Sequence, residues 1–87
     1  MIAMGKYDRL KEFLSLHKED RVPLTLRQIE LIIGAELPES AKVYGAWWSD
    51  PTSHSQVETW TSIGWKVSIH SDKGKIEWVE FTKNKTY

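Results

Sequence analysis

The side chains most capable of chemistry lie between positions 50 and 58. His54 stands four residues before Glu58, and residues four apart face one another on a helix. A histidine held by a carboxylate, here Glu58 or Asp50, beside Ser53 or Ser55 is the minimal outline of an activated nucleophile. No nucleophile-elbow or oxyanion motif accompanies these residues. We therefore expect a non-catalytic protein and rank a hydrolase-like enzyme using His54 third among the possible functions.

The same segment has the pattern of a helix start. Ser53 and Gln56 match a capping box, which satisfies free backbone N–H groups at the first turn. His54 and Ser55 are not needed for capping. Free N–H groups and the helix dipole also favour a bound anion such as phosphate. Plain capping is the simpler interpretation, and an anion site is the alternative.

Tryptophan is unusually frequent, with five in 87 residues. Trp60 and Trp65 fall on predicted buried faces and are assigned to the core. Trp47 and Trp48 are adjacent, and neighbouring side chains point in different directions on a helix or a strand. One of this pair is therefore a candidate for the surface, where it would stack on a base or fill a pocket of a partner protein.

Composition is that of one small domain, spanning residues 1–87. The chain has no cysteine, which excludes disulfides and thiolate metal sites. Its three histidines lie on different predicted elements, so we expect no metal and no cofactor. Twelve basic and twelve acidic residues cancel, although five lysines outnumber three acids from position 64 onward. No apolar run is long enough for a membrane span or a signal peptide, and we expect a cytoplasmic protein without a membrane partner.

Hydrophobic spacing predicts four helices. The first covers residues 6–17 and carries His17 on its apolar side as a hydrogen-bonded core histidine. The second starts with a Thr25–Gln28 capping box and ends at Gly34. A short third helix has Pro38 as its first residue and fades near position 45. The fourth covers residues 53–63 and turns the following side chains to solvent: Ser55, Glu58, Thr59 and Ser62.

Alternating patterns predict the strands. Residues 21–24 contain Pro23 and are either a brief edge strand or an extended link. Residues 65–70 alternate apolar and polar, residues 71–74 form a four-residue turn, and residues 75–82 return. Ile76 and Phe81 have opposite parity in the return strand, which indicates a bulge or burial on both faces. Residues 1–5 and 83–87 are expected to be flexible tails.

This order of elements resembles that of winged-helix domains. The resemblance implies an α+β fold with three to four short helices, a C-terminal β-hairpin as the wing and a possible third short edge strand. It places the helix over 53–63 in a DNA major groove, flanked by His54 and Gln56, while Lys66, Lys73 and Lys75 contact phosphates. That helix has no Arg or Lys, so the binding it predicts is weak or assisted by a partner.

A second resemblance rests on residues. The run Ala46-Trp47-Trp48, then Ser53-His54-Ser55-Gln56, then Gly64-Trp65 resembles a family of small uncharacterised bacterial domains, which implies a bacterial or phage setting and no mechanism. Our leading hypothesis is a small DNA-binding module that uses the helix 53–63 and the turn 72–75. The alternative is a protein-interaction or inhibitor module anchored by Trp47 or Trp48.

Overall fold

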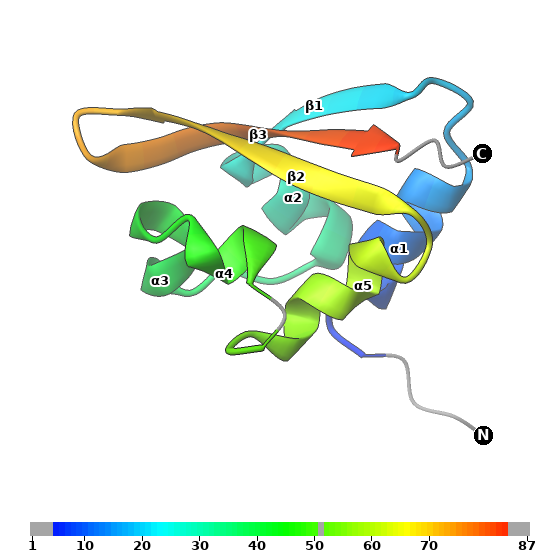
Figure 1. The fold of residues 1–87 in the computed structure, drawn as a ribbon, viewed down its shortest axis with the longest axis horizontal. Coiled ribbons are helices and arrows are strands. Elements are labelled where there is room, and N and C mark those ends of the chain that lie inside the picture. Colours follow the sequence, from blue (N-terminus) through cyan, green and yellow to red (C-terminus); the bar gives the residue numbers. More distant parts are fainter. Residues whose placement is uncertain (1–4, 51, 84–87) are drawn as a thin grey trace.

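The chain forms a three-stranded antiparallel sheet with its helices gathered on one face (Figure 1). The structure is a computed structural model and describes residues 5–50 and 52–83. Within these residues the order is α1 (Asp8–Ser15), β1 (Arg21–Thr25), α2 (Leu26–Ile33), α3 (Glu39–Val43), α4 (Ala46–Ser49), the 3-10 turn η1 (Ser55–Val57), α5 (Glu58–Thr61), β2 (Trp65–Asp72) and β3 (Lys75–Lys83). The α+β class predicted from the sequence is therefore confirmed.

The sheet has the strand order β1-β3-β2, so β1 and β2 are its edges. β1 confirms the edge-strand alternative for residues 21–24. Pro23 lies opposite Glu80 of β3, and an edge position tolerates its missing N–H because only one side of the strand is paired. The backbone N–H of Lys83 donates to the Asp20 carbonyl at 2.8 Å, so this residue of the expected C-terminal tail belongs to β3. Positions 1–4 and 84–87 lie outside the described residues.

The β2–β3 hairpin is tighter than the sequence predicts. Its strands continue to Asp72 and resume at Lys75, so only two residues form the loop. Lys73 and Gly74 have φ angles of 52° and 81°, and two positive values are typical of the type I′ turn that matches strand twist. The pairing shifts between His70 and Ser71, so of the two explanations for the parity change the structure shows the bulge.

α1 and α2 follow the predicted pattern. α1 is shorter than expected, and His17 lies beyond its end, half-buried, with Nδ1 3.1 Å from the Phe13 carbonyl. The capping box of α2 is confirmed: Thr25 Oγ1 accepts from the Gln28 N–H at 3.1 Å, and Gln28 Oε1 accepts from the Thr25 N–H at 2.8 Å. Gly34 ends α2 with φ 72°, as its left-handed position requires.

The predicted helix over 53–63 is wrong in its first half. Ser53 and Gln56 form no capping box, and His54 precedes η1 without a side-chain cap. Instead, Gln56 Nε2 donates to the Trp47 carbonyl at 2.9 Å, which ties this segment to α4. The α-helical part is the four-residue α5, where Trp60 is buried. A long-range side-chain bond has replaced the local capping pattern.

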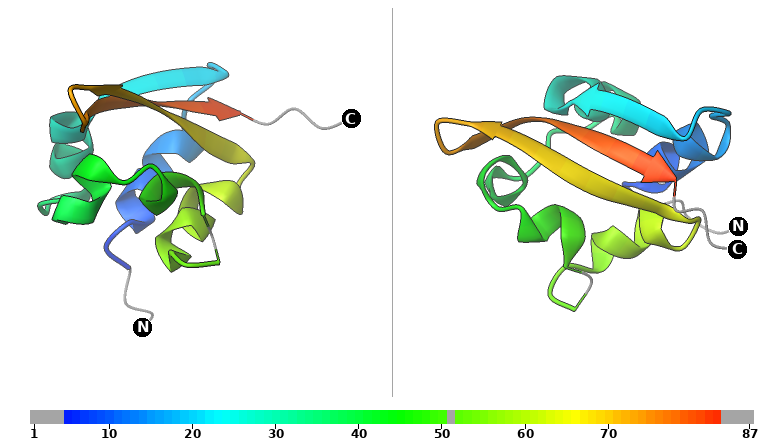
Figure 2. Two further views of the ribbon diagram at one scale, coloured as in Figure 1. Left: turned by 60° about the vertical axis from the view of Figure 1, so that its left-hand side comes forward. Right: turned by 45° about the horizontal axis from the view of Figure 1, so that its top comes forward.

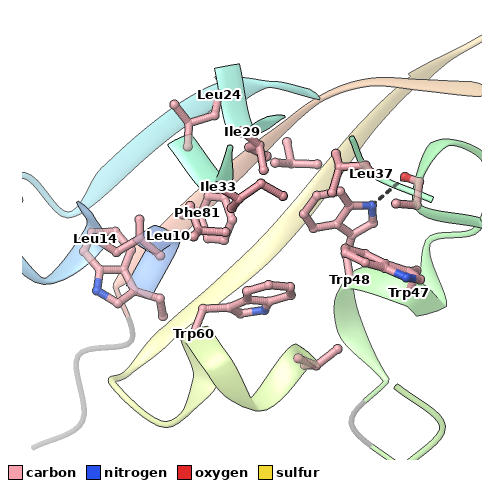
Figure 3. Packing of buried hydrophobic residues seen from close by; sticks show 14 of the residues in the cluster. Leu10, Leu14, Leu24, Ile29, Ile33, Leu37, Trp47, Trp48, Trp60 and Phe81 are labelled. Atoms are coloured by element: carbon pink, nitrogen blue, oxygen red, sulfur yellow. Dashed lines mark hydrogen bonds between the residues drawn. The ribbon is translucent and has the colours of Figure 1, made fainter. Parts of the chain in front are cut away.

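The core lies between the helices and the sheet and is rich in indole rings (Figure 3). Trp60 and Trp65 are buried, as predicted. Trp47 and Trp48 are only 5% and 1% exposed, so the expectation that one of them reaches the surface is wrong. Trp48 stacks on Trp60 at 5.8 Å, and Trp47 is covered by the edge-on ring of Tyr7 at 5.7 Å. Both neighbours are buried because α4 has packing partners on two sides.

Candidate functional site

The residues expected between 47 and 59 do not assemble a site. Trp47 and Trp48 offer no accessible ring face. Ser53 and Ser55 are exposed in the loop and the 3-10 turn, and His54 is half-buried between them. Gln56 is bonded to the Trp47 carbonyl, and Thr59 is half-buried in α5. A four-residue helix after a 3-10 turn does not provide the row of free N–H groups that an anion site needs.

Asp50 is used for local structure, and its contact with His54 is through the backbone: the Asp50 carbonyl accepts from the His54 N–H at 3.0 Å. Its Oδ1 accepts hydrogen bonds from Oγ1 and the backbone N–H of Thr52. These bonds, together with weaker ones from Ser53, hold the pKa of the Asp50 carboxyl below its ordinary value. In the part of the chain that the structure describes, no contact joins the imidazole of His54 to Asp50 or Glu58. The outline of an activated nucleophile is therefore not assembled.

Lys66, Lys73 and Lys75 lie on the hairpin, away from that segment. Figures 1 and 2 show the turn between β2 and β3 at the far end of the hairpin, on the side of α3 and α4, while α5 lies under the other half of the sheet. The helix 53–63 and the turn 72–75 thus do not form one continuous surface. The three lysines instead belong to a different surface, the side of the sheet that faces away from the helices.

This side of the sheet carries a regular set of polar and aromatic side chains. Alternation along each strand sends one set of side chains into the core and the other outward. Val22, Leu24, Val79 and Phe81 point inward and are buried. We call the opposite side the outer face, and its residues are Arg21, Pro23, Thr25, Lys66, Ser68, His70, Trp78, Glu80 and Thr82. None of the described helices covers it (Figure 2, right).

Strand pairing arranges the outer face in rows across the sheet. Arg21, Thr82 and Lys66 form the first row, and Thr25, Trp78 and His70 form the third. Glu80 occupies the centre of the second row, between Pro23 and Ser68. The first row therefore places a cation from each edge strand on either side of a central threonine.

An open hollow of about 550 Å³ lies over this first row. Its lining residues are Asp20, Arg21, Lys66, Ser68, Glu80, Thr82 and Lys83. Thr82 Oγ1 is buried beneath this surface, with no hydrogen-bond partner among residues 5–50 and 52–83. Arg21 and Lys66 are side chains of the kind that bind a phosphate oxygen, whereas Asp20 and Glu80 in the same lining oppose one.

The third row contains a parallel stack of two rings. The centroids of His70 and Trp78 are 3.8 Å apart and their planes differ by 5°. His70 is exposed and Trp78 is half-buried. The ring of His70 lies on edge strand β2, so one of its faces contacts Trp78 and the other points beyond the sheet.

Sequence reasoning missed Arg21, His70, Trp78 and Thr82 as site residues. The alternation in 65–70 does place Lys66 and His70 on one side of a strand. The bulge interrupts the alternation in β3. Ile76 is buried, so simple alternation would bury Trp78 two residues later, but the bulge brings Trp78 to the outer face. The contribution of Arg21 depends on β1 pairing with β3, which no local pattern predicts.

Comparison with known proteins gives one match. The model of a family described as a domain of unknown function (DUF7662) matches residues 7–78. No curated protein and no solved structure matches the chain. None of the helices in the described ranges is long and apolar enough to cross a membrane, and no three His, Cys, Asp or Glu residues in those ranges are placed to hold a metal ion.

Proposed function

The chain belongs to the DUF7662 family of domains of unknown function, and we propose that it is a non-catalytic module that binds nucleic acid through the outer face of its sheet and the turn 72–75. The observation that carries this proposal is the first row of the outer face. Arg21 and Lys66 are exposed and lie on opposite edges of the sheet, on either side of Thr82. Arg and Lys side chains are common ligands of a phosphate.

A second cationic group lies at the other end of the same hairpin. Lys73 and Lys75 are exposed at the turn. At about 3.3 Å per residue, the seven residues from Thr82 to Lys75 place the two cationic ends roughly 20 Å apart. A small anion occupies only one end, whereas a chain of phosphates reaches both. This separation favours a nucleic acid over a free phosphate.

Opposing charges limit the affinity. Glu80 lies between the two ends, and Asp72 and Glu77 lie near the turn. With Lys83 and Asp20 of the hollow included, five cations against four acids leave the surface only slightly positive, so binding is weak and sensitive to salt. Replacing Glu80 by Gln should therefore strengthen binding.

The winged-helix form of this function has partial support. The helices before the closing hairpin and the strand order β1-β3-β2 suit it. The chain between α2 and β2, however, is divided into α3, α4, η1 and α5, and residues 53–63 contain no Arg or Lys. We therefore place the nucleic acid on the hairpin and the outer face, and assign no groove contact to α5.

The proposal is tested by fluorescence anisotropy with labelled mixed-sequence oligonucleotides, single-stranded and duplex, over a range of salt. The double variant Arg21→Gln/Lys66→Gln should weaken binding and lower the slope of log K against log salt by about 1 for each lost contact. The matched control is Arg9→Gln/Lys18→Gln, which removes one exposed Arg and one exposed Lys from the helical layer. Absence of salt-dependent binding of any oligonucleotide at low ionic strength overturns the proposal.

A protein partner is the second candidate, now on a different surface. With Trp47 and Trp48 buried, the observation in its favour is Leu16, which is 77% exposed beside Phe13 and Ile32 at a hollow of about 460 Å³. Apolar side chains that gather around one hollow form a contiguous patch, and such a patch marks an interaction surface. Leu16→Glu should abolish capture of such a partner in a pull-down and leave oligonucleotide binding unchanged. Equal capture by the variant contradicts this candidate.

A further inference from the structure

We infer that the ligand is a single strand, with an unpaired base stacked on the exposed ring face of His70. This inference rests on the proposed function and specifies its substrate class. It is drawn from the third row of the outer face. This row contains the stacked rings of His70 and Trp78, which a purely electrostatic phosphate site does not need. The rings of His70 and Trp78 are 3.8 Å apart and nearly parallel, so they lie face to face.

The outer side of this stack is available to a ligand. His70 is exposed and lies on β2, beyond which the described part of the chain adds no further strand to the sheet. Trp78 supports its inner side from the central strand β3. The imidazole therefore ends the stack with a flat, open face, and a planar base placed there extends the series to three rings.

Unpaired bases are the part of a nucleic acid that fits such a surface. Stacking on an aromatic side chain depends on the flat face of the base and tolerates any sequence. In a duplex those faces are already stacked on neighbouring base pairs, and exposing one requires unstacking. A single strand presents its bases at much lower cost.

The aromatic pair also stands at the right place along the hairpin. It is four residues from the row of Lys66 and Thr82, about 13 Å away, and three residues from Lys75, about 10 Å away. A strand that follows the hairpin thus contacts cations at both ends and stacks a base between them. Because the two rings are already in contact, little side-chain freedom remains to be lost on binding.

The first test compares probes with the wild-type protein. We use a labelled oligodeoxynucleotide of about ten nucleotides, within the usual range of single-strand sites, an oligoribonucleotide of the same sequence, and the DNA as a duplex. The single strands should bind more tightly than the duplex, and the comparison of DNA with RNA identifies which of the two is preferred. Equal or tighter duplex binding overturns this inference and leaves the proposed function intact. Failure of all three probes to bind overturns the proposed function as well.

The second test removes the ring. His70→Ala should weaken single-strand binding about 5- to 150-fold, which corresponds to the usual contribution of one stacked base. His70→Tyr keeps a ring and should retain most of the affinity. His54→Ala is the matched control, since it also removes an imidazole ring but from the helical layer, away from the outer face. Circular dichroism establishes that each variant is folded. Unchanged affinity in folded His70→Ala overturns the inference, and if that variant does not fold, the probe comparison above still decides.

Discussion

Two buried tryptophans differ in one hydrogen bond, and that difference predicts unequal effects of the same substitution. Trp48 and Trp60 are 1% and 0% exposed and stack on one another at 5.8 Å. Nε1 of Trp48 donates to the Ala41 carbonyl at 2.8 Å (Figure 3). This carbonyl belongs to the last turn of α3, where helix geometry leaves acceptors unpaired. Nε1 of Trp60 is buried and finds no partner in the described residues.

Replacing either residue by Phe removes the same atoms from the same core. The loss of apolar contacts and the resulting cavity are therefore similar in the two variants. Trp48→Phe additionally leaves the Ala41 carbonyl buried and unpaired, which costs about 1–3 kcal/mol. Trp60→Phe instead eliminates an unpaired buried donor and recovers a penalty of about the same size. Trp48→Phe should therefore lower the free energy of unfolding by at least about 2 kcal/mol more than Trp60→Phe does.

The assay is urea unfolding followed by far-UV circular dichroism. Tryptophan fluorescence is unsuitable because each variant changes the emitting residues. Similar m-values in the two variants are required before the free energies are compared. A domain of this size has a total stability of roughly 4–13 kcal/mol, so a difference of about 2 kcal/mol is readily measured. Equal destabilisation of the two variants, or greater destabilisation by Trp60→Phe, would refute the reasoning.

Two further predictions concern the cap of α2 and the ring that covers Trp47. Thr25→Ala removes the hydroxyl that accepts from the Gln28 N–H and should destabilise the protein by about 1 kcal/mol, measured by urea unfolding; no change would mean that the capping box has no net effect. Burial raises the pKa of Tyr7. The unfolded chain therefore loses this phenolic proton first as pH rises above about 10, and the stability should fall from there through the folded-state pKa. Tyr7→Phe should show a smaller fall between neutral and strongly alkaline pH, and parallel falls in the two proteins would contradict this.

Short sequence patterns were sufficient to predict the elements that are stabilised by contacts between residues close together in the chain. The capping box at Thr25 and Gln28 joins residues three apart, and Gly34 is needed for a left-handed position at the helix end. The alternation in β2 likewise predicted the hairpin, and the change of parity in β3 indicated either a bulge or burial on both faces, of which the structure shows the bulge. In these segments propensity and tertiary packing favour the same structure.

The segment at 53–63 shows where this agreement ends. Ser53 and Gln56 have the spacing of a cap, but the amide of Gln56 bonds to the Trp47 carbonyl, nine residues away. Capping and this long-range bond compete for the same side chain. The spacing of Ser53 and Gln56 in the sequence indicates only the capping interaction, so it predicts a longer helix than the one that forms.

The sequence by itself determined the α+β class, most of the core and the closing hairpin, because residue periodicity and turn chemistry act over a few neighbours. It left residues 21–24 as either an edge strand or an extended link. Only the tertiary structure decided that Trp47 and Trp48 are both buried, since α4 is enclosed by Tyr7 on one side and Trp60 on the other. It also decided the candidate site. Arg21 and Lys66 are 45 positions apart in the chain and become members of one row only because β3 pairs with both edge strands. A surface assembled by strand pairing has no signature in any single stretch of the chain.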